Sequence, residues 1–416
     1  MTPYQFLKKH NQSVDDVQVT ECIEDFMTKM SRGLAGQGGM PMIPTYLMNV
    51  DRSLIKPYDK RILIDAGGTN FRVAVGYFDN CGKAVIENLE KSPMPASDGK
   101  YYGKQEFYGA IAERIKNHLN QAVNIGFCFS YQVNMGADVD GEVVMFSKEI
   151  CAPEVIGTKV GRETLNACKR YSDTDRKIVV LNDTVATLLG GMANSDKKYS
   201  AYLGYIYGTG TNVCYIENTA KIIKVSNLPA GEMLINTECG NYDGFARGDF
   251  DKACISRTAV PDKQLFEKMT SGKYLADIIA EAFAAAQKEG CFTGKAELAP
   301  FELKDVSAFL NGGEFPCRFD SDCDEQFARD ICRELISRSA LMGATVNAAI
   351  AVKSCKDKTL PVAIVAEGTT FNRLTGYRAE FERYLDEILS AHGIKYEILQ
   401  GEELNLVGTL MASMVL

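Results

Sequence analysis

The sequence contains no tryptophan and only three histidines, and the shortage of histidine restricts its chemistry. His10, His118 and His392 stand in charged segments of helical character, with no serine or cysteine nucleophile pattern around them. A Ser-His-Asp or Cys-His mechanism needs a histidine as its base, so hydrolysis by such a triad is disfavoured. We therefore expect any general base in this protein to be a carboxylate.

Paired cysteines are missing too. The thirteen cysteines are scattered and odd in number, and they form no Cys-x-x-Cys pair. This pattern predicts reduced, mostly buried thiols and argues against a structural zinc site.

The chain also lacks an excess of positive charge, because 46 Lys and Arg residues face 54 Asp and Glu residues, a net charge of −8. Such a balance does not suit nucleic-acid phosphates or anionic lipid, so we expect neither as a partner. No run of 18 apolar residues occurs, and residues 1–17 carry no apolar signal segment. We expect a soluble cytoplasmic protein and leave its oligomeric state open.

Three well-known nucleotide motifs are absent. The sequence has no Gly-x-x-x-x-Gly-Lys-[Ser/Thr] string, no Gly-x-Gly-x-x-Gly followed by a helix, and no protein-kinase signature. At 416 residues, 46% of them apolar, the chain is nevertheless long enough for two or three domains with cores of their own.

The sequence does contain a strand–turn–strand pattern, and this pattern occurs twice. Apolar runs at residues 61–64 and 71–78 flank one glycine turn, and runs at 199–207 and 213–216 flank another. A helical stripe over 105–123 and short apolar runs at 124–129 and 177–181 indicate helices lying on buried strands. The later chain is mainly helical, with helices predicted over 273–286, 325–352 and 377–392 and one strand over 361–365. This order predicts an α/β architecture in two lobes.

The two glycine turns are candidate phosphate sites. Asp65-Ala-Gly-Gly-Thr-Asn70 and Gly208-Thr-Gly-Thr-Asn212 each place glycines at a hairpin tip, where no Cβ blocks an approaching ligand. Either turn by itself could be a plain β-turn. Two similar turns, each after its own β run, favour backbone N–H groups that cradle phosphates.

Asp183 is the candidate catalytic carboxylate. Asn182-Asp183-Thr184 ends the apolar run at 177–181 and opens a helical segment over 184–192. Ligands of open α/β sheets bind at the carboxyl ends of strands, which is where Asp183 stands. Asp183 is alternatively the N-cap of the helix, and as a cap it would stay ionised and be a weak base. Phosphoryl transfer tolerates a weak base, because it depends more on orientation of the attacking hydroxyl than on early deprotonation.

Six strings in order along the chain resemble the successive signatures of the hexokinase family. They are Ile64-Asp-Ala-Gly-Gly-Thr-Asn-Phe-Arg-Val73, Gly126-Phe-Cys-Phe-Ser130, Leu181-Asn-Asp-Thr-Val185, Gly208-Thr-Gly-Thr-Asn-Val-Cys-Tyr215, Leu234-Ile-Asn-Thr-Glu-Cys-Gly240 and Phe266-Glu-Lys-Met-Thr-Ser-Gly-Lys-Tyr-Leu275. The resemblance implies the actin-like ATPase (RNase H-like) fold, with ATP and sugar in a cleft between a small and a large domain. We expect residues 60–183, with the C-terminal helix 403–416, to form the small domain, and residues 1–59 and 184–402 the large one.

The resemblance also implies roles for individual residues. Asp183 would accept the proton of the sugar 6-hydroxyl, and Lys148 would balance the charge of the γ-phosphate. The implied sugar-binding residues are Ser130, Ser147, Lys148, Asn182, Asp183, Asn212, Glu238 and Glu267. Asp65 would hold Mg²⁺ through water. The implied nucleotide-binding residues are Asp65, Gly67, Gly68, Thr69, Asn70, Arg72, Gly208, Thr209, Gly210, Thr211, Gly368 and Thr369.

Several positions depart from the family pattern. Phe146-Ser-Lys-Glu-Ile150 stands in place of Trp-Thr-Lys-Gly-Phe, Ser130-Tyr-Gln132 in place of Ser-Phe-Pro, and Glu238-Cys-Gly240 in place of Glu-Trp-Gly. Glu367 occupies a position where the family has Asp. These departures lie in the segments that shape the sugar pocket and the adenosine side, so they leave the preferred hexose open.

The resemblance thus predicts an ATP-dependent hexokinase that makes a hexose 6-phosphate, most simply from glucose, with MgATP as the second substrate. Kinases for mannose, fructose or an amino sugar are the main alternative. A sugar-sensing regulator would need a DNA-binding extension, and the roughly 60 residues before Asp65 do not resemble one. A filament ATPase is disfavoured by the sugar-type carboxylates.

Overall fold

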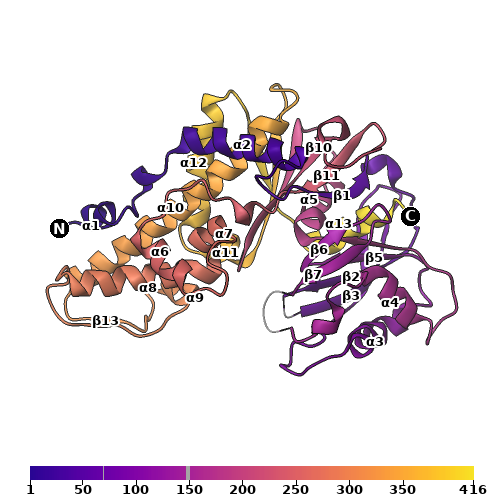
Figure 1. Ribbon diagram of the computed structural model, residues 1–416, viewed down its shortest axis with the longest axis horizontal. Coiled ribbons are helices and arrows are strands. Elements are labelled where there is room, and N and C mark those ends of the chain that lie inside the picture. Colours follow the sequence, from indigo (N-terminus) through magenta and orange to yellow (C-terminus); the bar gives the residue numbers. More distant parts are fainter. Residues whose placement is uncertain (69, 147–149) are drawn as a thin grey trace.

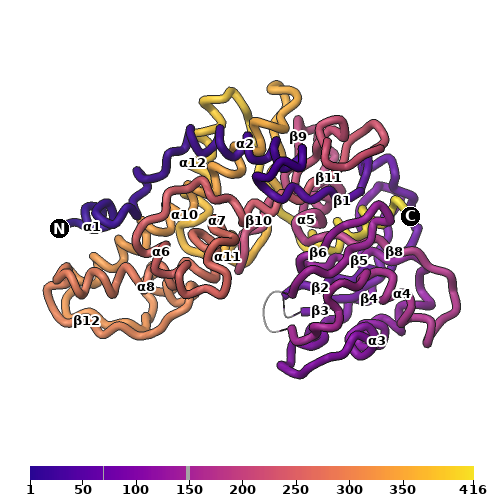
Figure 2. The backbone as a smooth tube through the Cα atoms, viewed as in Figure 1, coloured from indigo at the N-terminus to yellow at the C-terminus, as the bar shows by residue number. Residues whose placement is uncertain are grey.

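The computed structural model describes residues 1–68, 70–146 and 150–416, and it has two lobes, each built around a mixed β-sheet (Figure 1). The smaller lobe contains a five-stranded sheet in the order β4-β3-β2-β5-β8. The larger lobe contains a six-stranded sheet in the order β1-β11-β10-β9-β14-β15. Figure 2 shows the N-terminus at the far end of the larger lobe and the C-terminus beside the smaller one.

The small-lobe sheet begins with the predicted hairpin. Strands β2 (Arg61–Gly67) and β3 (Asn70–Phe78) pair antiparallel up to Gly67 opposite Asn70, and β4 (Ala84–Pro93) continues the meander. Strands β5 (Ile125–Phe129) and β8 (Ile178–Leu181) lie parallel to β2. All but the last residue of β2 are buried, as expected for a central strand with both faces covered.

Helices α3 (Lys104–Ile115) and α4 (Val160–Cys168) belong to this lobe. The helix expected over 105–123 is shorter than predicted, because the chain tightens into a 3₁₀ turn at Lys116–His118. His118 is buried there, and its Nε2 lies 3.0 Å from the carbonyl oxygen of Asn88.

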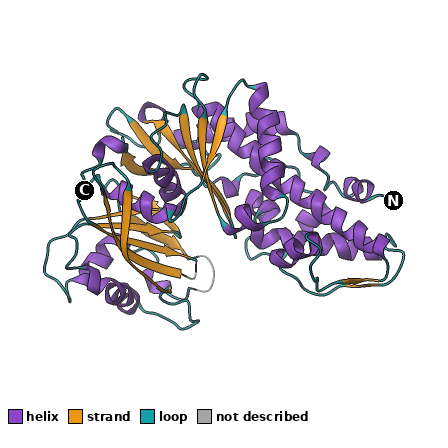
Figure 3. Ribbon diagram, turned by 180° about the vertical axis from the view of Figure 1, so that it is seen from behind, coloured by secondary structure: helices purple, strands orange, loops and turns teal. Residues whose placement is uncertain are grey.

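The large-lobe sheet contains the second predicted hairpin. Strands β9 (Ala201–Tyr207) and β10 (Thr211–Asn218) pair antiparallel, and β11 (Glu232–Asn236) and β1 (Ile43–Met48) follow on one side. Strands β14 (Val362–Glu367) and β15 (Tyr396–Leu399) extend the other side in parallel. Figure 3 shows most of the helices gathered in this lobe.

The longest helix, α10 (Asp322–Ser354), is long and apolar enough to cross a membrane, but 89% of its most apolar window is buried inside the protein. It is therefore the central core helix of the large lobe, which the apolar pattern at 325–352 predicted with shorter ends. The other large-lobe helices are α1 (Pro3–Lys9), α2 (Val19–Ala35), α6 (Asp249–Ser256), α7 (Leu265–Thr270), α8 (Gly272–Lys288), α9 (Leu303–Leu310), α11 (Thr369–Arg373) and α12 (Tyr377–Ala391). Two further strand pairs are β6 (Gln132–Met135) with β7 (Gly141–Met145) and β12 (Ala296–Glu297) with β13 (Arg318–Phe319).

Two helices, α5 (Asp183–Ala193) and α13 (Leu404–Ser413), cross between the lobes. Their apolar residues form one core with side chains from both sheets, such as Leu63 and Cys214. The crossing is close because glycines of both helices face the partner backbone. This pair therefore joins the two sheets and positions the site between them.

The thirteen cysteines are all free, and eight of them are buried. The prediction of reduced, mostly buried thiols is confirmed.

Candidate active site

Three polar side chains of the small lobe meet at one edge of its sheet. Asp65 lies two residues before the end of strand β2, Ser130 follows β5, and Asp183 follows β8. These strands are parallel, with Asp65 opposite Cys128 and Cys128 opposite Leu181, so their carboxyl ends reach the same edge. The parallel register therefore brings together Asp65 and Asp183, which are more than 100 positions apart in the sequence.

The cap of helix α5 is Asn182, not Asp183. The side chain of Asn182 accepts a hydrogen bond of 3.0 Å from the backbone N–H of Thr184, and Asp183 occupies the first helical position. Asp183 Oδ1 accepts from the same N–H at 2.8 Å. The N-cap role that the sequence offered for Asp183 thus belongs mainly to Asn182. Asp183 itself lies in the first turn, at the positive end of the helix dipole.

The electrostatic surroundings of Asp183 also differ from the expectation of an easily ionised cap. Burial and the nearby negative charge of Asp65 raise the pKa of the Asp183 carboxyl, although hydrogen bonds from Thr184 and Ser130 act in the opposite direction. A raised pKa makes the carboxylate a better proton acceptor. The fold therefore makes this residue a stronger base than its position after a strand suggests.

On the large-lobe side, three polar side chains form a hydrogen-bonded network. Asn212 Nδ2 donates to Asn236 Oδ1 at 2.7 Å, and Asn236 Nδ2 donates to Glu238 Oε1 at 2.8 Å. The side chains of Asn212 and Asn236 come from adjacent antiparallel strands, and Glu238 stands two residues beyond the second strand. The network holds the Glu238 carboxylate at a defined place beside the cleft.

Glu238 carries two signs of a functional residue. Its backbone has φ of +52°, which non-glycine residues adopt with strain, and strain of this kind collects at functional sites. Burial, together with the charges of Glu267 and Asp183, raises its pKa to about 7. Glu267 is nearby on α7, and its Oε2 accepts from the backbone N–H of Thr211 at 3.1 Å.

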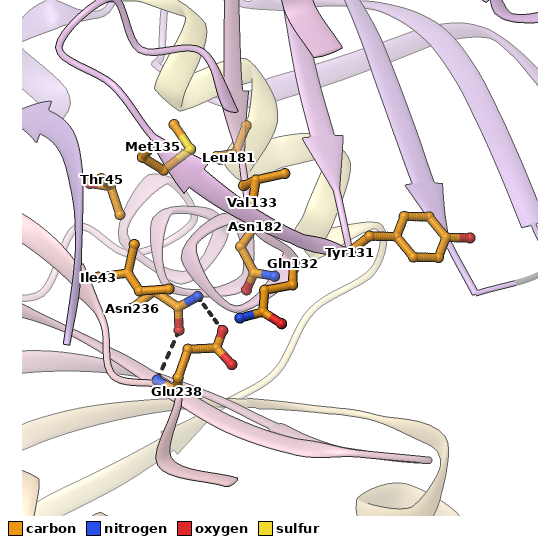
Figure 4. Close-up of a pocket in the computed structure, with 10 residues that line it drawn as sticks. All are labelled: Ile43, Thr45, Tyr131, Gln132, Val133, Met135, Leu181, Asn182, Asn236 and Glu238. Carbon is orange, nitrogen blue, oxygen red and sulfur yellow. Dashed lines mark hydrogen bonds between the residues drawn. The ribbon is translucent and has the colours of Figure 1, made fainter. Parts of the chain in front are cut away.

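Three of these residues, Asn182, Asn236 and Glu238, line a pocket to which both lobes contribute (Figure 4). Asn182 and Gln132 come from the small lobe, and Asn236 and Glu238 from the large lobe. The other lining residues are Ile43, Thr45, Tyr131, Val133, Met135 and Leu181. Carboxylates and amides bind pairs of hydroxyl groups with directional hydrogen bonds, so this arrangement suits a polyhydroxylated ligand.

Around the first glycine turn, Arg72 is held by two carboxylates. Its guanidinium donates to Asp65 Oδ2, with Nε at 2.8 Å, and to Glu403 at the start of α13. Gly68 has φ of +60°, and a Cβ on Gly67 would lie 3.0 Å from the Ser130 hydroxyl. Glycine is therefore favoured at residue 67 by the neighbouring side chain and at residue 68 by the backbone conformation.

The second turn meets two other loops of the large lobe. The N–H of Gly272 donates to the carbonyl of Gly208 at 2.9 Å, and a Cβ on Gly272 would overlap the hydroxyl of Thr370. Gly368 has φ of +128°, and a Cβ there would overlap the carbonyl of Tyr207. Two glycines, Gly272 and Gly368, thus allow the backbones of the hairpin, the segment after β14 and the start of α8 to come together.

Other predicted residues of this region take different positions. Asn70 and Thr209 are exposed at the two hairpin tips, and Thr369 is exposed at the start of α11. Thr211 is buried, and its backbone N–H is bound to Glu267, so in this structure it supports that carboxylate. A Cβ on Gly210 would lie 2.5 Å from Glu267 Oε2, which explains the glycine. Thr69, Ser147 and Lys148 lie outside the described residues.

Some site residues were not singled out from the sequence. Asn236 lies inside the string Leu234–Gly240, and an amide two residues before a candidate carboxylate was the available signal. Gly272 likewise lies inside the string that begins at Phe266. Glu367, noted in the sequence only as a departure from the family pattern, ends β14. Burial raises its pKa to about 7, with Asp65 and Asp183 adding to the shift and Arg72 opposing it.

The chain matches known proteins over most of its length. Two family profiles, both described as hexokinase, match residues 6–193 and residues 202–415. Hexokinase-1 of Schizosaccharomyces pombe is 26% identical, over 93% of this chain and 85% of that protein. Hexokinase-5 of Oryza sativa subsp. japonica is 31% identical, over 68% of this chain and 58% of that protein.

A structural comparison shows the same kind of fold. The hexokinase from Schistosoma mansoni complexed with glucose superposes with a TM-score of 0.82 at 20% identity, covering 100% of both chains. At this identity the likeness shows the fold alone. The predicted fold class, α/β in two lobes, is therefore confirmed.

Proposed function

This chain belongs to the hexokinase family, and we propose that it transfers the γ-phosphoryl group of MgATP to the 6-hydroxyl of a hexose, with glucose as the first candidate. The observation that carries the proposal is the placement of Asp183. A carboxylate with a raised pKa stands at the carboxyl edge of the small-lobe sheet, beside a pocket lined with amides and Glu238.

The reaction requires little covalent chemistry from the protein. The sugar oxygen forms a bond to the γ-phosphorus while the bond from that phosphorus to the bridging oxygen of ADP breaks. Asp183 accepts the hydroxyl proton, and its raised pKa favours this acceptance. Because the transition state of phosphoryl transfer is loose, orientation of the hydroxyl by Asp183 is the larger contribution.

The glycine turns fit the nucleotide. Backbone without Cβ atoms at Gly67 and Gly68 leaves room for phosphate oxygens. Arg72 is the proposed cation beside the turn, and in this structure its guanidinium is bound to Asp65 and Glu403. No group of three or more metal-ligating side chains occurs among the described residues. This suits Mg²⁺ that arrives with ATP, since Mg²⁺ keeps most of its waters and needs few protein carboxylates, with Asp65 as the proposed partner through water.

We also propose the expected division of the chain, in which residues 60–183 and 403–416 form the small domain and the remainder the large one. Support comes from α13, which packs against β2 and β5 of the small-lobe sheet as well as against α5. Free thiols fit the reducing cytoplasm. A kinase for mannose, fructose or an amino sugar is the second candidate, favoured by the departures at Gln132 and Cys239.

A coupled assay with MgATP and a panel of hexoses tests the proposal. Wild-type protein should phosphorylate at least one hexose at the 6-position, and Asp183→Ala should lower kcat by roughly 10²–10⁴ with sugar binding retained. Asp173→Ala, an exposed aspartate in the same lobe, is the matched control. Turnover of Asp183→Ala within threefold of wild type would overturn the role of Asp183, and failure on every hexose would overturn the function.

A further inference from the structure

Gln132 is a polar side chain of the pocket, and neither the family pattern nor the fold has so far given it a role. It is the first residue of β6 in the small lobe, and its side chain is exposed where it lines the pocket. Figure 4 shows Gln132 and Glu238 pointing toward one another from opposite lobes. In the described structure the carboxylate of Glu238 accepts hydrogen bonds from the side chains of Asn236 and Asn212, and none from Gln132.

The backbone holds Gln132 in this orientation. Tyr131, the preceding residue, is buried, and its hydroxyl donates to the carbonyl of Gly68 at 2.6 Å. Val133, the following residue, is also buried and pairs with Val143 of β7. Because both neighbours are anchored by buried side chains, the backbone position of Gln132 is fixed, and its exposed side chain lines the pocket between them.

The chemistry of the two facing groups is complementary to a hydroxyl. An ionised Glu238 carboxylate can only accept hydrogen bonds, whereas the Gln132 amide nitrogen can only donate. A sugar hydroxyl does both, so its O–H can donate to Glu238 while its oxygen accepts from Gln132 Nε2. One hydroxyl between them would satisfy both groups.

We propose that Gln132 is a specificity-determining sugar ligand of the small lobe, which shares one hydroxyl of the hexose with Glu238 across the cleft. The proposal rests on the proposed hexokinase function and adds a residue to that site. The hexokinase family pattern has proline at this position, and proline has no side-chain hydrogen-bond donor. This protein should therefore discriminate more strongly against a sugar that lacks the shared hydroxyl, because such a sugar leaves Gln132 and Glu238 unpaired.

The test is a cycle of protein variants against deoxy sugars. Gln132→Ala, Gln132→Glu and Gln132→Pro are assayed with glucose, 2-deoxyglucose, 3-deoxyglucose and 4-deoxyglucose, and sugar binding without nucleotide is measured by calorimetry. We expect Gln132→Ala to reduce kcat/KM for glucose by about tenfold, the size of one net hydrogen bond, mainly through KM. For one deoxy sugar, the one lacking the shared hydroxyl, the variant and wild type should agree within twofold.

The variants distinguish loss of the Gln132 hydrogen-bond donor from a change in the size of its side chain. Gln132→Glu keeps the side-chain length but replaces the donor with a carboxylate that faces Glu238, so it should bind glucose more weakly than Gln132→Ala at pH 8. Gln121→Ala is the control, because Gln121 is an exposed glutamine of the same lobe, hydrogen-bonded to Asn88. It should leave all sugars unchanged.

Two results would overturn the proposal while leaving the proposed function standing. One is a Gln132→Ala variant whose kcat/KM for glucose is within twofold of wild type. The other is a Gln132→Ala variant whose kcat/KM falls by the same factor for every deoxy sugar. If wild-type protein binds hexoses without phosphorylating them, the calorimetric cycle still decides the role of Gln132. If it binds none, the proposal and the function fall together.

Discussion

Gly408 of helix α13 lies against the backbone carbonyl oxygen of Ala186 on helix α5. A Cβ atom on residue 408 would overlap that oxygen and would come within 2.8 Å of the amide nitrogen of Gly190. The reverse contact is equally close, because a Cβ on Gly190 would overlap the carbonyl oxygen of Leu404. The two helices that join the lobes therefore touch backbone to backbone.

We expect Gly408→Ala to lower the free energy of unfolding by about 2 kcal/mol, because overpacking of a close contact forces the backbones apart. Alanine has the higher helix propensity, which by itself would raise stability by roughly 1 kcal/mol. Denaturant unfolding of the variant and the wild type measures the difference. A variant that is as stable as wild type or more stable would contradict the close crossing.

The first glycine turn yields a second prediction. Gly68→Val should raise KM for ATP at least tenfold or abolish activity, since valine resists φ of +60° and fills space that phosphate oxygens would use. Gly99→Val is the matched control, because Gly99 has φ of +75° in the same lobe and no heavy atom within 4 Å of an added Cβ. ATP affinity, measured by titrating each folded variant with ATP, distinguishes the effect of backbone strain from loss of the phosphate site. Normal ATP affinity in Gly68→Val would favour a plain turn.

The raised pKa of Glu238 predicts a pH-dependent KM for the sugar. Below its pKa of about 7 the carboxyl holds a proton and loses acceptor capacity, and above it the carboxylate accepts freely. KM for the hexose should therefore fall by about tenfold from pH 6 to pH 8, in proportion to the ionised fraction. Steady-state assays at saturating ATP measure this change.

Glu238→Gln supplies the comparison for that profile. Its KM should be higher than that of wild type at pH 8 and flat with pH, because the titrating group is gone. Glu367 also has a pKa raised to about 7, but it ends β14 next to Gly368, an expected nucleotide-binding residue, so its titration should affect KM for ATP. A sloping sugar profile in Glu238→Gln would assign the effect to another group.

The division of the pocket between two lobes predicts closure on the sugar. Asn182 and Gln132 line it from one side and Asn236 and Glu238 from the other, so one small ligand can contact both sets fully only when the lobes approach. Small-angle scattering should show a smaller radius of gyration with the preferred hexose alone. ATP hydrolysis without sugar should be far slower than transfer, because water cannot bridge the lobes. An unchanged scattering profile together with rapid hydrolysis would indicate a preformed cleft.

The sequence by itself determined the local elements. Strands 61–64 and 71–78 with glycines between them form a hairpin because the turn is short and its φ requirement can be met locally by Gly68. Short-range signals also located helix α10 and the strand that precedes Asp183. They placed Asp183 after a strand but could not decide between Asn182 and Asp183 as the cap, since both side chains can serve and only the backbone geometry selects one.

Only the tertiary structure decided the chemistry of the site. The raised pKa values of Asp183 and Glu238 arise from burial and from carboxylates that lie far away in the sequence, which no local pattern contains. The hydrogen bond between Asn212 and Asn236 depends on the register of two strands, and the facing of Gln132 and Glu238 depends on how the lobes are joined. These pKa shifts and side-chain contacts depend on packing between residues that are distant in the sequence, so no local sequence pattern predicts them.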